Sequence, residues 1–293
     1  MNATEYGDGR VLLELDAGVA HVCLNRPEKK NALDTGMFEG LVQAAHRVRD
    51  DPSIRVAVLS GAGDCFCSGL DFSTFGAMAD GGLDAESEDV AAASRDLSPA
   101  GANRAQQIAW LWQEVPVPVI AAVCGAAYGG GFHIALGADI RFIAPDARIA
   151  FVEITWGLVP DLSGTQALRR LVPLDVAKKL IFSGEPISGT QAVAWNLGTE
   201  LSDRPLEDAF ALARVIASRS PDAVRAAKQL LNSSGLVSLR EGLANEFQAS
   251  AGLMGGANQL EAVVARLQKR EPRFADPGSG APGPSERSAD TAD

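Results

Sequence analysis

Residues Cys124 to Asp139 read CGAAYGGGFHIALGAD, in which the end of an apolar run, three consecutive glycines and a helix-like segment follow one another. Glycine costs conformational entropy on folding, but it adopts positive φ values and lets a ligand approach the main chain closely. Amide N–H groups at the start of a helix have no intrahelical partner. The stretch therefore predicts a strand-to-helix turn that offers backbone donors to a bound oxygen. It matches neither the GxGxxG dinucleotide pattern nor a P-loop, since no Gly-Lys-Ser/Thr follows.

A second glycine turn has the same arrangement earlier in the chain. The apolar run IRVAVLSG at 54–61 precedes Ser68-Gly69-Leu70-Asp71, much as PVPVIAAVCG at 116–125 precedes the three glycines. Two turns that each place free amides at or near a helix start predict an oxyanion hole, provided that the donors converge.

Strand-like and helix-like patterns alternate over the first half of the chain. Short β-branched or alternating apolar runs indicate strands, and helical spacing after an Asp34 or Thr35 N-cap indicates a helix. Ala17-Gly18 between two strand-like runs indicates a hairpin. The expected strands lie within 10–16, 19–25, 54–61, 116–125 and 139–154, and the expected helices within 34–51 and 105–115. This alternation predicts an α/β layer structure, followed from Gly164 onward by a mostly helical region.

The chain of 293 residues is long enough for one large domain with a smaller helical appendage. We expect the core in residues 1–200 and a C-terminal helical region in 201–275. Residues 76–104 are rich in Ala, Asp, Gly and Ser, which predicts a surface insertion with a weak helix in it. Residues 276–293 offer almost nothing to bury, which predicts a disordered tail.

The charge balance is acidic, with 37 Asp and Glu against 26 Lys and Arg. An acidic surface repels phosphate backbones and anionic lipid, so we expect no nucleic-acid partner. No leader-like segment opens the chain, and no apolar run approaches the roughly 20 residues of a spanning helix. We therefore expect a cytoplasmic protein without a membrane partner. The cysteines lack metal-ligand spacing, so we expect no metal site and small buried thiols at Cys23, Cys65, Cys67 and Cys124.

Four motifs carry a family resemblance. They are LNRPEKKNAL at 24–33, FCSGLDF at 66–72, GAAYGGGFHIALGADIRF at 125–142 and FVEITWGLVPDLSGTQALRRL at 151–171. In order and spacing they resemble the enoyl-CoA hydratase/isomerase (crotonase) superfamily, from about Val11 to the closing EPRFADP at 271–277. The insertion at 76–104 lies where that family varies.

The resemblance implies a crotonase-like spiral of repeated ββα units with a C-terminal helical trimerisation region. It implies homotrimers that often pair into hexamers, and an acyl-CoA thioester substrate whose coenzyme A makes a separate cofactor unnecessary. It assigns the two oxyanion-hole donors to the amides of Leu70 and Gly130, which would stabilise an enolate formed from the thioester. One such donor is typically worth about 10² to 10³ in rate.

Hydratases of the family position a water molecule with two glutamates. The second matches Glu153, whereas the first matches His133, three residues past Gly130 on the same helix face. A histidine can hold a water molecule or act as an acid and base near neutral pH, but it does not reproduce a two-carboxylate site. The alternative for His133 is a helix histidine hydrogen-bonded to a neighbour, and for Glu153 a surface strand residue.

A further carboxylate lies eight residues after Glu153, at Asp161, where the dienoyl-CoA isomerase branch carries an aspartate. Two carboxylates on opposite sides of an acyl chain suit a proton shuttle. The alternatives for Asp161 are a cap of the following helix or a turn residue. Enoyl- or dienoyl-CoA isomerisation is therefore favoured over hydration, and a non-catalytic acyl-CoA-binding relative is a third interpretation.

The remaining candidates are expected to contact substrate or CoA. Trp156 is a candidate wall of the acyl pocket, with a core tryptophan as the alternative. The turn residues Ser68 and Asp71 are expected to line the substrate. Cationic candidates for the CoA phosphates are Arg26, Lys29, Lys30 and Lys269, of which we single out Lys29 and Lys269, and a solvated basic face is the alternative.

Overall fold

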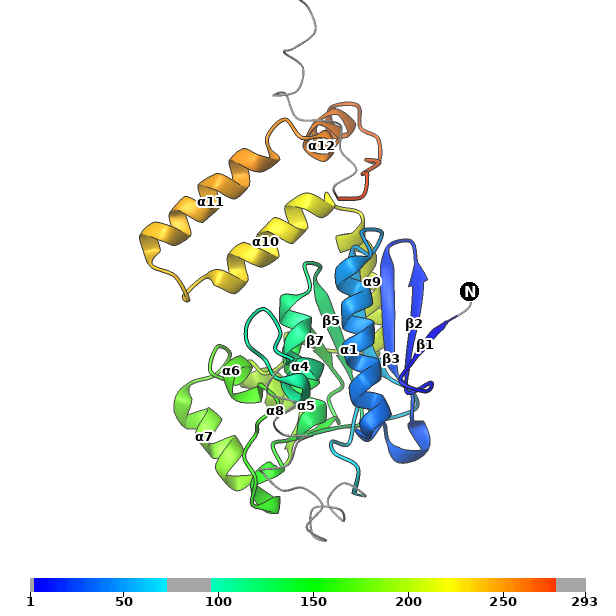
Figure 1. Ribbon diagram of the computed structural model, residues 1–293, viewed down its shortest axis with the longest axis vertical. Coiled ribbons are helices and arrows are strands. Elements are labelled where there is room, and N and C mark those ends of the chain that lie inside the picture. Colours follow the sequence, from blue (N-terminus) through cyan, green and yellow to red (C-terminus); the bar gives the residue numbers. More distant parts are fainter. Residues whose placement is uncertain (1–2, 73–95, 278–293) are drawn as a thin grey trace, which may run out of the picture.

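The computed structural model describes residues 3–72 and 96–277 (Figure 1). Residues 76–95 of the expected insertion and residues 278–293 of the expected tail lie outside these ranges. The chain has a mixed α/β architecture with a largely parallel sheet, as the sequence predicts.

The main sheet has seven strands in the order β1-β2-β3-β4-β5-β7-β10. Its strands are β1 (Thr4–Tyr6), β2 (Val11–Asp16), β3 (Val19–Leu24), β4 (Val56–Gly61), β5 (Val119–Val123), β7 (Ile140–Ile143) and β10 (Glu200–Leu201). The first three pair antiparallel and every later pairing is parallel. A second sheet has the order β6-β8-β9 and consists of β6 (Ala126–Tyr128), β8 (Arg148–Ala150) and β9 (Ile187–Ser188).

The expected hairpin is confirmed between β2 and β3. Asp16 pairs with Val19, and the two residues between them, Ala17 and Gly18, have φ values of 47° and 81°. Two consecutive positive φ values are what a two-residue hairpin turn requires.

Helices cover both faces of the main sheet. On one side lie α1 (Thr35–Asp50), α4 (Arg104–Glu114) and α5 (Gly130–Gly137), and on the other lies α9 (Pro205–Ala217) (Figure 1). Alternate residues of β4 therefore enter two separate apolar clusters, Ala57 and Leu59 in one and Val56 and Val58 in the other. This double coverage explains why β4 is apolar without alternation.

The expected cap of α1 is confirmed, because the Asp34 carboxylate accepts a hydrogen bond of 2.9 Å from the amide of Met37. The other helical elements are η1 (Pro27–Lys29), η2 (Glu153–Trp156), α6 (Gly164–Leu168), α7 (Leu174–Ser183), α8 (Gly189–Ala194), α10 (Pro221–Ser233), α11 (Leu239–Leu253) and α12 (Ala257–Leu267).

Helices α10 to α12 stand away from the sheet (Figure 1). Helix α11 has no buried residue, and several large apolar side chains of this region are exposed, among them Leu231, Leu239, Phe247 and Leu267. Since α9 packs on the sheet, the helices that leave it begin with α10, and a division at residue 200 stays a prediction.

Lys228 ties α10 to the core. Its Nζ donates hydrogen bonds of 2.9 Å to the carbonyls of Trp112 and Val117 and lies 2.8 Å from the Asp139 carboxylate. The side chain is only 7% exposed, and burial lowers the pKa of Lys228 while Asp139 opposes that shift. An ammonium group thus caps carbonyls at and just beyond the end of α4.

Candidate active site

The first predicted donor is fixed by a short parallel bridge between Leu33 and Leu70. The amide of Leu33 donates to the carbonyl of Gly69 (2.8 Å), and the amide of Asp71 donates to the carbonyl of Leu33 (3.0 Å). In a trans peptide the Gly69 carbonyl and the Leu70 N–H point in opposite directions. The Leu70 amide therefore points away from Leu33, and no acceptor within residues 3–72 and 96–277 binds it.

Gly69 is required for this turn. Its φ is +92°, and a Cβ at this position would lie 2.8 Å from the carbonyl oxygen of Tyr128. Both the positive φ and the close approach of another backbone exclude a larger residue.

The second predicted donor, Gly130, begins α5, with Gly129 as N-cap at φ +49°. Its amide also has no acceptor in the part of the chain that the structure describes. A Cβ on Gly130 would lie 2.8 Å from methyl carbons of Leu33 and Leu162. Because Leu33 also pairs with Leu70, both predicted donors flank the same residue.

A second bridge brings the two turns into register. Cys67 pairs in parallel with Ala127, so the chain at 67–70 runs beside the chain at 127–130. A Cβ on Gly131 would lie 2.5 Å from the carbonyl oxygen of Cys67. Each of the three glycines therefore faces a close neighbour that a side chain would displace. Both amides, which have no acceptor among the described residues, thus lie in neighbouring turns, as an oxyanion hole requires, and the convergence and roles of Leu70 and Gly130 stay predictions.

Glu153 and His133 lie beside these glycines. The Glu153 Oε1 atom is 3.3 Å from His133 Nε2, and it would be 2.9 Å from a Cβ on Gly129. Glu153 opens the 3-10 turn η2 rather than ending a strand as expected, because β8 stops at Ala150. Its side chain is 13% exposed, so the alternative of a surface strand residue is wrong.

His133 is fully enclosed, with a side chain that is 0% exposed. Burial lowers its pKa to about 3, although the nearby backbone of Leu162 opposes the shift. The imidazole is therefore neutral at pH 7. Among the described residues neither ring nitrogen has a hydrogen-bond partner, and neither does the buried Oε2 of Glu153. The expected alternative, a helix histidine hydrogen-bonded to a neighbour, differs from this arrangement.

The turn before α6 closes over these groups. Leu162 contacts the position above Gly130, and a Cβ on Gly164 would lie 2.6 Å from the His133 ring. Asp161 lies in this turn, and the cap alternative is wrong because Ser163 is the N-cap of α6. Solvent reaches Asp161, yet partial burial raises its pKa.

Both carboxyl groups therefore hold protons more tightly than usual. Burial is the main cause that raises the pKa of Glu153, and the negative charge of Asp161 adds to it. A base whose pKa rises toward neutrality transfers protons more readily at working pH. The sequence brought these two residues together only through the family spacing, and the structure places them within electrostatic reach.

Two aromatic rings join the two halves of the site at the surface. Trp156 is 46% exposed, so the core alternative is wrong, and its ring meets that of Phe72 edge-on at a centroid distance of 5.9 Å. Phe72 is itself 75% exposed and follows Leu70 by two residues. An acyl-pocket role for Trp156 stays a prediction.

The remaining candidates for contact with substrate or CoA lie in different parts of the molecule. Lys29 lies beside the first turn, where the Ser68 hydroxyl donates to its carbonyl at 3.4 Å. Lys269 follows α12, at the end of the molecule away from α5 and α6 (Figure 1), so one chain does not bring it to the site. Asp71 pairs with Arg26 at 2.5 Å, and a contact of Arg26 with CoA phosphates stays a prediction.

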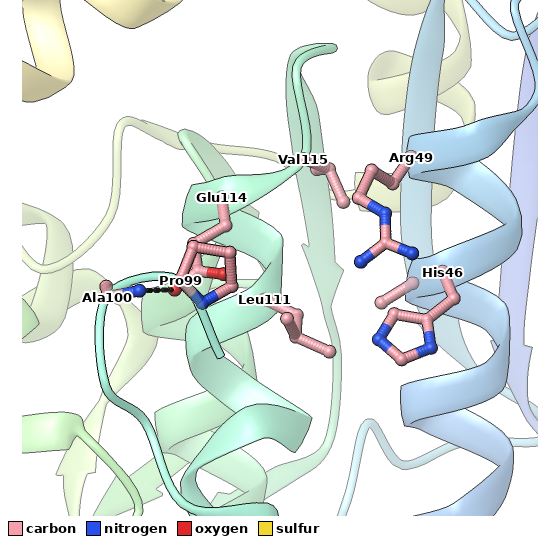
Figure 2. A pocket seen from close by; sticks show the side chains of 8 residues that line it. His46, Arg49, Pro99, Ala100, Leu111, Glu114 and Val115 are labelled. Carbon is pink, nitrogen blue, oxygen red and sulfur yellow. Dashed lines mark hydrogen bonds between the residues drawn. The ribbon is translucent and has the colours of Figure 1, made fainter. Parts of the chain in front are cut away.

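A pocket of about 360 Å³ lies elsewhere, between the C-terminal halves of α1 and α4 (Figure 2). It is lined by Ala45, His46, Arg49, Pro99, Ala100, Leu111, Glu114 and Val115. The residues of α1 that line it lie 11 to 15 positions beyond Asp34, hence roughly 16 to 22 Å along the helix from the N-cap at Asp34, which adjoins the bridge between Leu33 and Leu70. It contains neither predicted donor.

Residues 3–72 and 96–277 contain neither a metal-binding cluster nor a membrane-spanning helix. No group of three or more His, Cys, Asp or Glu side chains in these ranges is arranged to hold a metal ion. No helix there combines the length and apolar character needed to cross a bilayer. The four cysteines are free thiols; Cys65 and Cys67 are buried, whereas Cys23 and Cys124 are half-buried.

Comparison with known proteins gives consistent matches along the chain. The family model described as enoyl-CoA hydratase/isomerase matches residues 14–277. A 2,3-dehydroadipyl-CoA hydratase of Escherichia coli (strain K12) is 37% identical over 256 residues, which cover 86% of this chain and 92% of that protein. An (E)-benzylidenesuccinyl-CoA hydratase of Thauera aromatica is 35% identical, covering 90% and 98%. The crystal structure of an enoyl-CoA hydratase from Polaromonas sp. JS666 superposes with a TM-score of 0.79 at 28% identity, covering 90% of this chain and 99% of that one.

Proposed function

The chain belongs to the enoyl-CoA hydratase/isomerase family, and from that premise we propose that it catalyses double-bond isomerisation in an enoyl- or dienoyl-CoA thioester. The amides of Leu70 and Gly130 hold the thioester oxygen while negative charge develops on it. Glu153 removes a proton from the acyl chain, and Asp161 returns one at another carbon. Asp161 therefore starts the cycle protonated and Glu153 ends it protonated, and proton exchange with solvent restores both groups, so the reaction needs no cofactor beyond the coenzyme A of the substrate.

One observation carries the proposal: the partner of Glu153 is a neutral imidazole, and the second carboxylate of the site is Asp161. His133 has no proton to give as an acid at pH 7, because burial lowers its pKa to about 3. Glu153 and Asp161 both have raised pKa values, which suits the exchange of a proton with carbon.

Hydration is the second candidate, and two observations favour it. The relatives compared above are named hydratases. In addition, three buried polar atoms without partners in the described chain, Nδ1 and Nε2 of His133 and Oε2 of Glu153, are groups that a buried water molecule would satisfy. In that case Glu153 activates the water and His133 orients it.

The two reactions are separated by substrate. We expect the protein to convert cis-3-enoyl-CoA or 3,5-dienoyl-CoA to the isomer whose double bond is conjugated with the thioester carbonyl. Chromatography of the acyl-CoA products measures this conversion. Conversion of trans-2-enoyl-CoA to the 3-hydroxyacyl product without any isomerase turnover would replace isomerisation by hydration. Measurable acyl-CoA binding without turnover of any of the three would support the non-catalytic relative. Glu153→Ala is the control that removes the proposed base.

We also propose that the protein assembles as a homotrimer or as a hexamer of two trimers. The exposed apolar side chains of α10 to α12 support this, since exposed patches of this extent usually mark an interface. Light scattering coupled to size exclusion measures the mass directly, and a monomer at micromolar concentration would refute the assembly. The acidic charge balance supports the absence of nucleic-acid partners.

A further inference from the structure

Arg26 occupies a position that links the first turn of the site to the start of α1. Its NH1 atom lies 2.5 Å from the Asp71 carboxylate, and its Nε lies 3.4 Å from the Asp34 carboxylate. The side chains of Arg26 and Asp71 are both 13% exposed, so this ion pair is largely shielded from water and salt. Arg10 also contacts Asp34, at 2.8 Å.

The two carboxylates that Arg26 contacts each come directly after one residue of the bridge between Leu33 and Leu70. Asp34 comes directly after Leu33, and Asp71 comes directly after Leu70, the predicted donor. The bridge itself consists of only two backbone hydrogen bonds, one on each side of Leu70. A single guanidinium therefore joins the two chain segments one residue beyond the bridge, where the ladder would otherwise end.

The loop that carries Arg26 is itself held rigidly. Asn31 is 0% exposed, and its amide group donates to the carbonyls of Cys65 (2.7 Å) and Ala62 (2.9 Å). Its side-chain oxygen accepts from the Arg26 amide at 2.8 Å. The loop at 26–33 is thus anchored to the segment just before the turn at 68–71, which fixes the backbone from which the Arg26 side chain extends.

We propose that Arg26 is a positioning residue that fixes the direction of the Leu70 amide through its ion pair with Asp71. The direction of that amide follows from the peptide plane shared with the Gly69 carbonyl, which Leu33 holds. The guanidinium thus adds a side-chain link to the backbone hydrogen bonds that hold this plane, next to a glycine that tolerates many conformations. The inference rests on the proposed thioester enolate, but it holds for isomerisation and hydration alike.

The effect belongs mainly to the transition state. Donors aimed at an oxyanion act most strongly where charge has developed, so disorder in one donor lowers kcat more than it raises KM. Loss of one donor typically costs about 10² to 10³ in rate, and loss of its positioning costs less, so we expect a roughly 10- to 100-fold fall in kcat.

The test uses Arg26→Met and Asp71→Asn in the full-length protein, singly and combined, with Arg47→Met as the matched control. Arg47 of α1 also pairs with an aspartate, the C-cap residue Asp51, at 2.7 Å, but at the end of the helix away from Asp34 and the turn at 68–71. The first readout is kcat and KM on whichever enoyl-CoA the wild type converts. The second is the near-ultraviolet absorbance of bound acetoacetyl-CoA, whose enolate reports the oxyanion hole without turnover.

We expect both single variants to lose kcat and enolate absorbance, the double variant to lose no more than either, and the control to retain both. Wild-type values in Arg26→Met and Asp71→Asn, or equal losses in the control, would overturn the positioning role. Should Arg26→Met fail to fold, the nearly isosteric Asp71→Asn decides the question alone. A wild type that forms no enolate with acetoacetyl-CoA would overturn the proposed function itself, which separates the two failures.

Discussion

The neutral, buried His133 makes the folded state sensitive to mild acid, and the size of the effect can be worked out. The pKa of this imidazole is about 3 in the folded protein against an ordinary value of 6.5. A folded pKa below the unfolded value means that the unfolded chain binds more protons between these limits. The stability is therefore complete above about pH 6.5 and is lost as the pH falls. Protonation of the unfolded state at pH 5 costs about 2 kcal/mol of unfolding free energy.

The assay compares wild type with His133→Gln by urea unfolding at pH 7, 6 and 5. Glu153 faces the ring and has a raised pKa, so its own contribution to stability increases as the pH falls, opposite to that of His133. This contribution is present in both proteins. The difference between the two proteins therefore isolates His133. We expect the wild type to lose about 2 kcal/mol more than the variant between pH 7 and pH 5. Parallel loss in both proteins would refute a buried neutral imidazole.

Three further predictions follow from the same contacts. Glu153→Gln should lower kcat about 10²- to 10⁴-fold with little change in acyl-CoA binding, and the acid limb of wild-type kcat/KM should lie above pH 4.5, because burial raises the pKa of this base; a limb below that value would contradict the burial. Gly164→Ala should destabilise the fold by ~1–3 kcal/mol in chemical unfolding, since the added Cβ meets the His133 ring at 2.6 Å, whereas Gly242→Ala, with nothing closer than 3.8 Å, should not. Lys228→Met should cost about 3 kcal/mol because it leaves Asp139 without its buried partner, and an unchanged unfolding midpoint would show that the ion pair contributes nothing.

The elements that the sequence predicts well are those with a long pattern. The hairpin at Ala17-Gly18 and helix α1 each combine a periodic run with a turn or cap residue, and two local signals then agree. The strands that the sequence misses, such as β6, β9 and β10, have only two or three residues. A run of that length shows no period, and the partner strand decides whether it pairs.

Some features of the site can likewise be predicted from the sequence, and others cannot. The glycine turns are visible in the sequence because positive φ and close approach of neighbouring atoms both demand glycine. The structure shows positive φ at Gly69 and Gly129, close approach of the Tyr128 backbone at Gly69, and close approach of the Glu153 carboxylate at Gly129. Burial is not visible. The local sequence around a helix histidine is the same whether its ring is hydrated or buried. The neutral state of His133 therefore follows only from its surroundings in the folded structure.

The ion pair between Arg26 and Asp71 joins residues 45 positions apart, and no local pattern distinguishes such an arginine from one on a solvated face. The sequence therefore suggested phosphate as its partner, on charge alone. In the structure the same guanidinium reaches both the carboxylate after Leu33 and the carboxylate after Leu70. The sequence shows that a positively charged side chain needs an anionic partner, whereas the fold determines which anion lies next to it. In this chain that anion is the carboxylate of Asp71, next to the predicted donor Leu70, so the ion pair joins the motif LNRPEKKNAL to the motif FCSGLDF.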